Sequence, residues 1–291
     1  MSQDEANEVG NGVESDTKTS KKKLTRRQVI SRILMGAIGA GFVRTEWETN
    51  RIVVTRHVVS LPNVHIGAKP FRVVQLSDLH RSNMVSEGMI RKACSIAMDQ
   101  KPDVIALTGD YVTGKSEYIY SCREAMEELK APLGVWGILG NHDYAENQSE
   151  RIQEAMAARG MPLLVNDNVK LDNGVYLVGI DDLSEGFPNL QKAFGGIPES
   201  SPVLTMGHNP RLVRGLEGVP TIMMSGHTHG KQINIKGFTS ITGRNIPYVS
   251  GWFQVGKLRL YVNRGIGVIR IPLRVLSAPE VTVYDFVPKV T

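Results

Sequence analysis

Five apolar segments of this 291-residue chain end in the same way, with a short polar group directly after the last apolar residues. The groups are Asp78-x-His80, Asp110 after Gly109, Asn141-His142-Asp143 after Gly140, His208-Asn209 after Gly207, and His227-x-His229 after Gly226. In open α/β sheets, ligands bind at the edge formed by the carboxyl ends of the strands. The repetition therefore predicts one site that is built from five loops, and a fold that brings residues 78 and 229 together.

The segments between these groups alternate between strand and helix patterns. Apolar or β-branched runs predict strands at 52–61, 71–76, 104–108, 134–139, 175–180, 203–206, 221–224, 257–262 and 281–286. Helical periodicity predicts helices at 87–100, 116–129 and 149–159. No repeat and no linker divides residues 51–291, so we expect one α/β domain over residues 46–291.

The N-terminal region differs in character from the rest of the chain. Residues 1–24 are polar and have almost nothing to bury, which predicts disorder. In residues 25–45, the pair Arg26-Arg27 precedes an apolar, glycine-rich run from Ile33 to Val43, a pattern that resembles a twin-arginine export signal. The run is shorter than the about 20 residues of a bilayer-spanning helix. The alternatives are a basic amphipathic helix packed on the domain and, if the signal is not cleaved, a membrane tether.

Charge and cysteine content exclude several classes of protein. The formal net charge is +5, of which residues 1–45 supply +3, so the body is nearly neutral and nucleic acid is not an expected partner. Two cysteines exclude a multi-disulfide scaffold and a four-thiolate zinc site. Both Cys94 and Cys122 recur with apolar residues at helical spacing, so we expect them to be buried on helices without a chemical role.

The polar groups have the chemistry of metal ligands. Oxygen and nitrogen donors without thiolates suit divalent manganese, iron or zinc. In an extended segment residues i and i+2 point the same way, so Asp78 with His80, and His227 with His229, would each face one point. A cap, a turn or a core histidine would explain any one group alone. Five such groups at five strand ends favour a metal site.

In this order the motifs resemble the signature of the calcineurin-like metallophosphoesterase superfamily, over about residues 70–285. The stretches 208–210, 226–232 and 260–267 are similar to those of YkuE/YaeI-type bacterial phosphoesterases, some of which carry twin-arginine signals. One departure is Lys231, which stands where that group often has glycine; it would bind acidic substrate or be a solvated lysine. The resemblance implies a four-layer α/β/β/α sandwich, in which helices flank two mixed sheets.

The resemblance also implies a centre of two divalent metal ions. One ion would be held by Asp78, His80, Asp110 and His229, and the other by Asp110, Asn141, His208 and His227. A hydroxide shared by the two ions would attack phosphorus. His142 would not be a ligand but would stabilise the phosphoryl oxygens or protonate the leaving oxygen. Asp143 would orient the His142 imidazole, or else be a helix cap or turn residue.

From these features we expect an exported, metal-dependent phosphoesterase at the cell envelope. Its substrates would be phosphodiesters or pyrophosphates, either small molecules or lipid-linked. Its partners would be the twin-arginine export machinery and, through the N-terminal segment, the membrane surface. The alternatives are an intracellular phosphomonoesterase and a catalytically weak scaffold that retains the metal site. The loops at 182–207 and 236–253, the latter with Arg244, Tyr248 and Trp252, are expected around the site.

Overall fold

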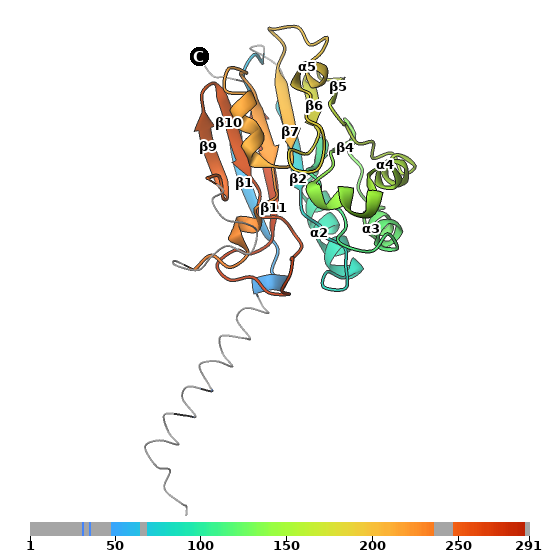
Figure 1. The fold of residues 1–291 in the computed structure, drawn as a ribbon. Helices are drawn as coiled ribbons and strands as arrows, with labels where there is room; N and C mark the ends of the chain where they lie inside the picture. The colour runs from blue at the N-terminus through green and yellow to red at the C-terminus, as the bar shows by residue number, and fades with distance from the viewer. Residues whose placement is uncertain (1–30, 32–34, 36–47, 65–68, 236–246, 289–291) are drawn as a thin grey trace, which may run out of the picture. The chain divides into compact units, whose positions relative to one another are not determined.

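Strands from the two ends of the domain pair within one sheet of the computed structural model (Figure 1). The model describes residues 48–64, 69–235 and 247–288, together with Ser31 and Met35. The expectations for residues 1–24 and almost all of 25–45 therefore lie outside the described residues. The part of the chain that is described contains no helix long and apolar enough to cross a membrane.

The first sheet has five strands in the order β1-β11-β2-β3-β4. These are β1 (Val53–Ser60), β11 (Glu280–Val287), β2 (Phe71–Leu76), β3 (Val104–Leu107) and β4 (Val135–Gly137). Strand β11 runs parallel to β1 and antiparallel to β2, while β2, β3 and β4 are mutually parallel. The carboxyl ends of β2, β3 and β4 therefore meet at one edge.

The second sheet has six strands in the order β5-β6-β7-β8-β10-β9. These are β5 (Asp167–Lys170), β6 (Tyr176–Ile180), β7 (Val203–Gly207), β8 (Ile222–Ser225), β10 (Leu258–Val262) and β9 (Gly251–Val255). The four central strands are parallel, and the two edge strands are antiparallel to their neighbours. Both sheets are thus mixed, as the resemblance implied.

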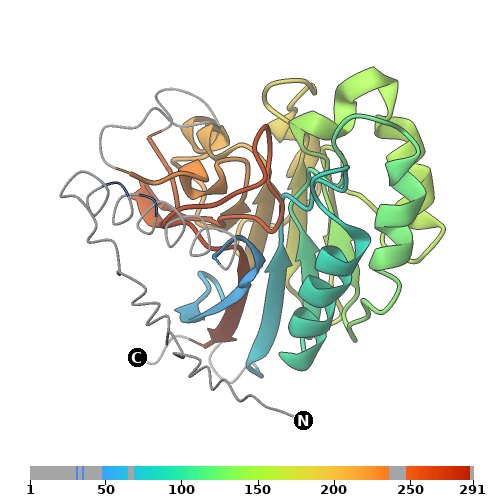
Figure 2. The same cartoon turned by 90° about the horizontal axis from the view of Figure 1, so that it is seen from below.

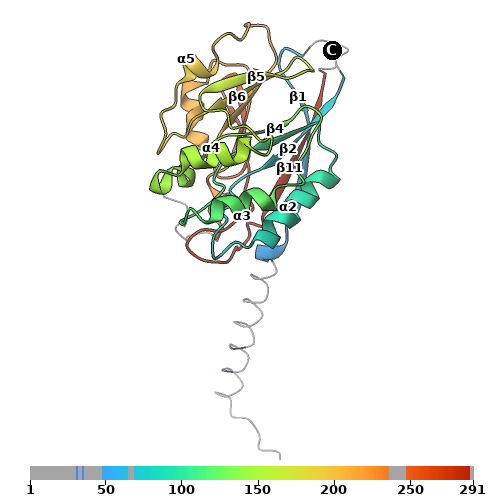
Figure 3. The same cartoon turned by 90° about the vertical axis from the view of Figure 1, so that its right-hand side faces the viewer.

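Helices cover the outer face of each sheet. On the first sheet these are α2 (Glu87–Asp99), α3 (Tyr118–Ala125) and α4 (Ser149–Ala157), which face the viewer in Figure 3 and lie to one side of the strands in Figure 2. The second sheet is covered more thinly, by α5 (Leu190–Ala193) and the 3₁₀ helix η2 (Pro210–Gly215). This arrangement confirms the four-layer α/β/β/α sandwich.

Three apolar cores separate the four layers. One lies between the first sheet and its helices and includes Cys94 and Cys122, which are free, buried thiols on α2 and α3 as expected. A second core fills the space between the two sheets, where Val73 of the first sheet and Leu204 of the second both contribute to it. A third core holds α5 and η2 against the second sheet. Because side chains alternate along a strand, Val73 and Val74 of β2 face different cores.

One buried polar side chain ties the two sheets together beneath the loops. The Gln75 amide of β2 donates to the Thr108 hydroxyl at 2.8 Å and to the Ser225 carbonyl of β8 at 3.0 Å. Its oxygen accepts from the Tyr284 hydroxyl at 2.6 Å. A fully buried amide with all these partners favours one alignment of the two sheets. The carboxyl ends of β2, β3, β4, β7 and β8 are therefore held close together.

Candidate metal centre

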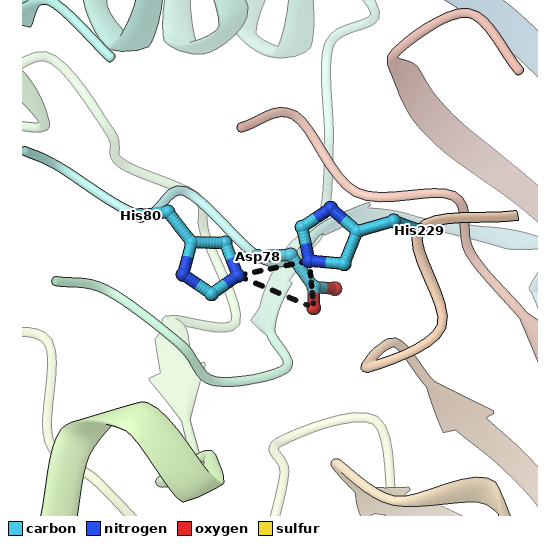
Figure 4. A group of neighbouring side chains, drawn as sticks. All are labelled: Asp78, His80 and His229. Atoms are coloured by element: carbon cyan, nitrogen blue, oxygen red, sulfur yellow. Dashed lines mark hydrogen bonds and ion pairs between the residues drawn. The ribbon is translucent and has the colours of Figure 1, made fainter. Parts of the chain in front are cut away.

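Asp78, His80 and His229 point their donor atoms at one another (Figure 4). The Nε2 atoms of His80 and His229 are 2.9 Å apart, and Asp78 Oδ1 is 3.8 Å and 3.3 Å from them, respectively. All three side chains are buried. Asp78 and His80 come from the loop after β2, whereas His229 comes from the loop after β8, so the group is completed across the two sheets.

A second group of donors, from Asp110, Asn141, His208 and His227, lies beside the first. Asp110 connects the two groups. Asp110 Oδ2 is 3.4 Å from His80 Nε2 and 3.2 Å from His208 Nε2. His227 Nδ1 is 3.3 Å from His208 Nε2 and 2.8 Å from Asn141 Oδ1. One carboxylate oxygen thus faces donors of both groups. The seven ligand positions that the resemblance implied lie together at one edge of the two sheets.

Five of the ligand residues have the same strained, left-handed backbone conformation. Asp78, Asp110 and His227 have positive φ angles of 52°, 58° and 73°, and His80 and His229 do as well. Each such residue costs about 1–3 kcal/mol, and such strain concentrates at functional sites. Hydrogen bonds between loops stabilise it: Asp78 N–H donates to the Gly109 carbonyl at 3.0 Å, and His227 N–H to Asp78 Oδ1 at 2.9 Å.

Two glycines leave room for the ligands. Gly109 has a φ of +89°, and a Cβ atom there would lie 2.6 Å from the backbone nitrogen of Gly140. At Gly226 a Cβ atom would collide with the Ser77 hydroxyl and the Asp78 carboxylate. At Gly226 the constraint is the space that the Asp78 carboxylate occupies.

The electrostatics of the cluster favour a cation. Burial alone would raise the pKa of both carboxylates, but the imidazoles around them, mainly His229 for Asp78 and His208 for Asp110, hold it below its ordinary value. Burial and the nearby His208 lower the pKa of His227 to about 4. Asp110 outweighs burial at His208 and raises its pKa. Two buried carboxylates that stay ionised suit a divalent cation, which would displace a proton from His208.

In two ligand histidines, the nitrogen that faces away from the cluster has a hydrogen-bond partner that orients the ring for metal binding. His208 Nδ1 lies 2.7 Å from the Thr108 carbonyl, which can only accept, so Nδ1 keeps its proton and Nε2 is the nitrogen that a cation would bind. His80 Nδ1 lies 2.6 Å from the Thr113 hydroxyl. Such outer partners fix the tautomer and the ring orientation of metal-ligating histidines. The donor set and its supports therefore fit divalent metal ions.

His142 lies at the rim of the cluster and is half-buried. Its ring is edge-on to that of His80, with centroids 4.8 Å apart, and its backbone N–H donates to Asp110 Oδ1 at 2.8 Å. One of its ring nitrogens lies within 4.8 Å of donor atoms of His80 and Asp110. Burial lowers the pKa of this imidazole. The position allows His142 to reach a substrate bound at the cluster.

In the part of the chain that the structure describes, the hydrogen bonds of the Asp143 carboxylate go to backbone amides and not to the His142 ring. The carboxylate accepts backbone N–H groups of Asp110 and Tyr111, each at 2.8 Å, and of Gly140 at 2.9 Å. The side chain is fully buried, and burial together with Asp110 raises its pKa to about 8. Through these contacts Asp143 fastens the loop after β4 to the loop after β3.

Two supporting residues were not found from the sequence. Thr113 lies between His80 and His142, three positions after Asp110 in a loop that the motif had already marked. Arg274 is fully buried, and its guanidinium donates to the carbonyls of Gly267 and Gly265 at 3.1 and 3.2 Å. Burial lowers its pKa to about 9. An arginine without an acidic neighbour in the sequence gives no signal that its guanidinium is buried among backbone carbonyls.

Arg81, directly after His80, and the aromatic residues expected around the site contact other parts of the chain. The Arg81 guanidinium donates to the Val85 carbonyl at 3.1 Å and lies over the Tyr118 ring. Trp252 on β9 packs against Tyr261. Tyr248 packs against Phe253 on the same strand as Trp252. Lys231 is half-buried just after His229, and Arg244 lies outside the described residues.

Comparison with known proteins identifies a family over the part of the chain that contains these residues. A model of the calcineurin-like phosphoesterase family matches residues 71–231, which include every ligand position. The metallophosphoesterase YkuE of Bacillus subtilis is 29% identical over 280 residues, which cover 90% of this chain and 98% of that protein. The phosphodiesterase YaeI of Escherichia coli is 30% identical over 235 residues, covering 76% and 84%. The UDP-2,3-diacylglucosamine pyrophosphatase LpxG of Chlamydia muridarum is 27% identical over 295 residues, covering 81% and 89%. The chain therefore belongs to the calcineurin-like phosphoesterase family of hydrolases.

Proposed function

We propose that this protein hydrolyses phosphodiester or pyrophosphate bonds with two divalent cations, one held by Asp78, His80, Asp110 and His229 and the other by Asp110, Asn141, His208 and His227. The observation that carries this proposal is the position of Asp110 Oδ2, which lies within 3.4 Å of a histidine of each group. Bound cations of this kind polarise the phosphoryl group and lower the pKa of water to near neutrality. Manganese, iron and zinc all suit the oxygen and nitrogen donors.

The other residues would position the substrate and complete the reaction. Asp143 holds the loops after β3 and β4 at a fixed separation, so that Asp110 and Asn141 face the same point. His142 would donate a hydrogen bond to the leaving oxygen or to the phosphoryl oxygens, which carry more negative charge in the transition state. Because the loops are fastened to each other through backbone hydrogen bonds, this arrangement exists before substrate binds.

The substrate class rests on the cations near the site and on the relatives. A phosphomonoester dianion is usually gripped by further cations such as an arginine fork. Arg81, which lies closest in sequence to Asp78 and His80, is already used by the Val85 carbonyl and the Tyr118 ring. Two relatives are named as a phosphodiesterase and as a pyrophosphatase for a diacylated sugar nucleotide. We therefore favour diesters and pyrophosphates, including lipid-linked ones, over monoesters.

We expect kcat/KM for bis-nitrophenyl phosphate to exceed that for mono-nitrophenyl phosphate when both are measured with the same metal. Lys231→Ala in parallel measures whether the one extra cation after His229 contributes to either value. A clear preference for the monoester would show that the substrate class is wrong while the two-metal site stands. No hydrolysis of either ester, or of a nucleotide-sugar pyrophosphate, with manganese, iron or zinc would contradict the proposed activity itself.

We also propose that the protein is exported through the twin-arginine pathway and acts at the cell envelope. Support comes from Arg26-Arg27 before the apolar run, in a segment distinct from the phosphoesterase domain that we assign to residues 46–291. The double change Arg26→Lys and Arg27→Lys should leave the protein inside the cell, protected from protease added outside. Arg44→Lys, at the other end of the run, is the matched control and should be exported. Equal export of the double variant would contradict this route.

A further inference from the structure

The Thr113 hydroxyl lies between two imidazoles that have different expected roles. It is 2.6 Å from Nδ1 of the metal ligand His80 and 3.5 Å from Nδ1 of His142. The backbone fixes it there, because Thr113 N–H donates to the Arg81 carbonyl at 3.1 Å and Val112 forms a parallel bridge with Arg81. Thr113 is thus held against the loop after β2, with its hydroxyl beside the His142 ring of the loop after β4.

The protons of this trio follow from what each group can donate. His80 Nε2 faces Asp110 and His229, so a cation held there requires a lone pair on Nε2 and places the ring proton on Nδ1. That N–H donates to the Thr113 oxygen. The threonine hydroxyl has one proton of its own, and its remaining acceptor in the trio is His142 Nδ1. The 3.5 Å separation is long, as catalytic hydrogen bonds often are before substrate binds.

We propose that Thr113 is a positioning residue that fixes neutral His142 as the Nε2–H tautomer, so that this ring meets the substrate as a hydrogen-bond donor. The inference rests on the proposed phosphoesterase function and assigns a residue to it. Among the described residues, Thr113 is the hydrogen-bond partner of His142 Nδ1, and none of them bonds to Nε2. Asp143 cannot take this place, since its oxygens bind backbone amides.

The identity of the residue changes what the imidazole can do. A carboxylate beside Nδ1 accepts a proton, so a neutral ring would then carry its proton on Nδ1 and would present a bare Nε2. A hydroxyl that accepts from His80 still has its own proton, which it can donate to His142 Nδ1. His142 can therefore donate to a phosphate oxygen without first being protonated. The same hydroxyl also couples the orientation of His142 to that of a metal ligand.

Thr113→Val tests the role by removing the hydroxyl while keeping the shape of the side chain. At saturating metal we expect kcat for bis-nitrophenyl phosphate to fall about 10- to 100-fold, the usual loss for partners of this kind, with little change in KM. Thr113→Ser should recover most of the loss. Thr221→Val is the matched control, because it removes a buried hydroxyl that donates to the Val203 carbonyl at 2.9 Å, directly before β8 and so at the opposite end of that strand from the ligand loops. Equal kcat for Thr113→Val and wild type would overturn the proposal.

A double variant separates an effect through His142 from one through His80. If Thr113 acts through His142, adding Thr113→Val to His142→Ala should cause no further loss of kcat at saturating metal. A full additional 10- to 100-fold loss would assign Thr113 to His80 alone and overturn the proposal. Metal content and the melting temperature of each variant, measured on the full chain, show that folding and loading are retained.

The tautomer itself is measurable without turnover. In the zinc-loaded protein labelled with ¹⁵N-histidine, the signals absent from His142→Ala belong to His142. We expect the proton on Nε2 in wild type and Thr113→Ser, and a mixture of the two tautomers in Thr113→Val. A proton on Nδ1 of wild-type His142 would overturn the proposal. Absence of any phosphoester hydrolysis would contradict the proposed function alone, because these signals do not depend on activity.

Discussion

Asp110→Asn should lose at least one of two bound metal ions and almost all activity. The carboxylate oxygen Oδ2 lies 3.4 Å from His80 Nε2 and 3.2 Å from His208 Nε2, so this single oxygen faces donors of both sets. Asparagine keeps the shape but replaces the shared charge with a neutral amide. Metal ions supply several kcal/mol of transition-state stabilisation, which corresponds to a fall in kcat of about 1000-fold or more.

Metal content by elemental analysis and kcat on the same preparation provide the measurement. Asp172→Asn removes an exposed carboxylate from the turn after β5 and is the matched control for the loss of one charge. It should retain both metal ions and its activity. Near-normal turnover by Asp110→Asn with two bound ions would remove the bridging role of Asp110 and with it the two-metal proposal.

The positions of the strands followed closely from the sequence because buried parallel strands are continuous apolar runs. Strand β2 has the predicted bounds of residues 71–76, and β3 ends one residue before its predicted end. The two strands that were not predicted, β5 and β9, lie at opposite edges of the second sheet, and β5 has the polar sequence Asp167–Lys170. The polar edge strand β5 lacks the apolar pattern on which the prediction depends.

The order of the strands could not be predicted in the same way. Strand β11 inserts between β1 and β2, so the last strand of the domain pairs with its first two. Such pairing depends on contacts between residues more than 200 positions apart, for example Val54 with Val281. Local propensity carries no information about it. The family resemblance supplied the arrangement of layers instead.

The candidate site shows the same division between local and distant information. Each ligand was marked by its own short motif, because a strand end, a glycine and a polar group are adjacent in the sequence. Asp143, next to His142 in the sequence, was one candidate partner for it, but Asp143 lies in the first turn of the 3₁₀ helix 141–147 and binds backbone amides of the loop after β3. Thr113, which is distant in the sequence, lies beside the ring instead. Adjacent residues on a turn point in different directions, so sequence neighbours were a poor guide to contacts.

His142→Ala should keep both metal ions but lose about 10²- to 10⁴-fold in kcat, the usual contribution of a proton-donating group. The contact of residue 142 with Asp110 is made by its backbone N–H at 2.8 Å, so alanine retains it and leaves the bridging carboxylate in place. The loss should be smaller for a nitrophenol leaving group than for an alkyl alcohol, because nitrophenolate needs less stabilisation as it departs.

Diesters with leaving groups of graded acidity, assayed at saturating metal, measure this dependence. His57→Ala removes a half-buried histidine that packs against Tyr261, outside the site, and should leave the dependence on leaving group unchanged. Equal losses for good and poor leaving groups would place the His142 hydrogen bond on the other phosphoryl oxygens. Loss of metal would make His142 a ligand. This outcome is a real test, because a ring nitrogen of His142 lies within 4.8 Å of donor atoms of His80 and Asp110. Retained metal with a graded loss would assign the donor to the leaving oxygen, because that oxygen alone changes across the series.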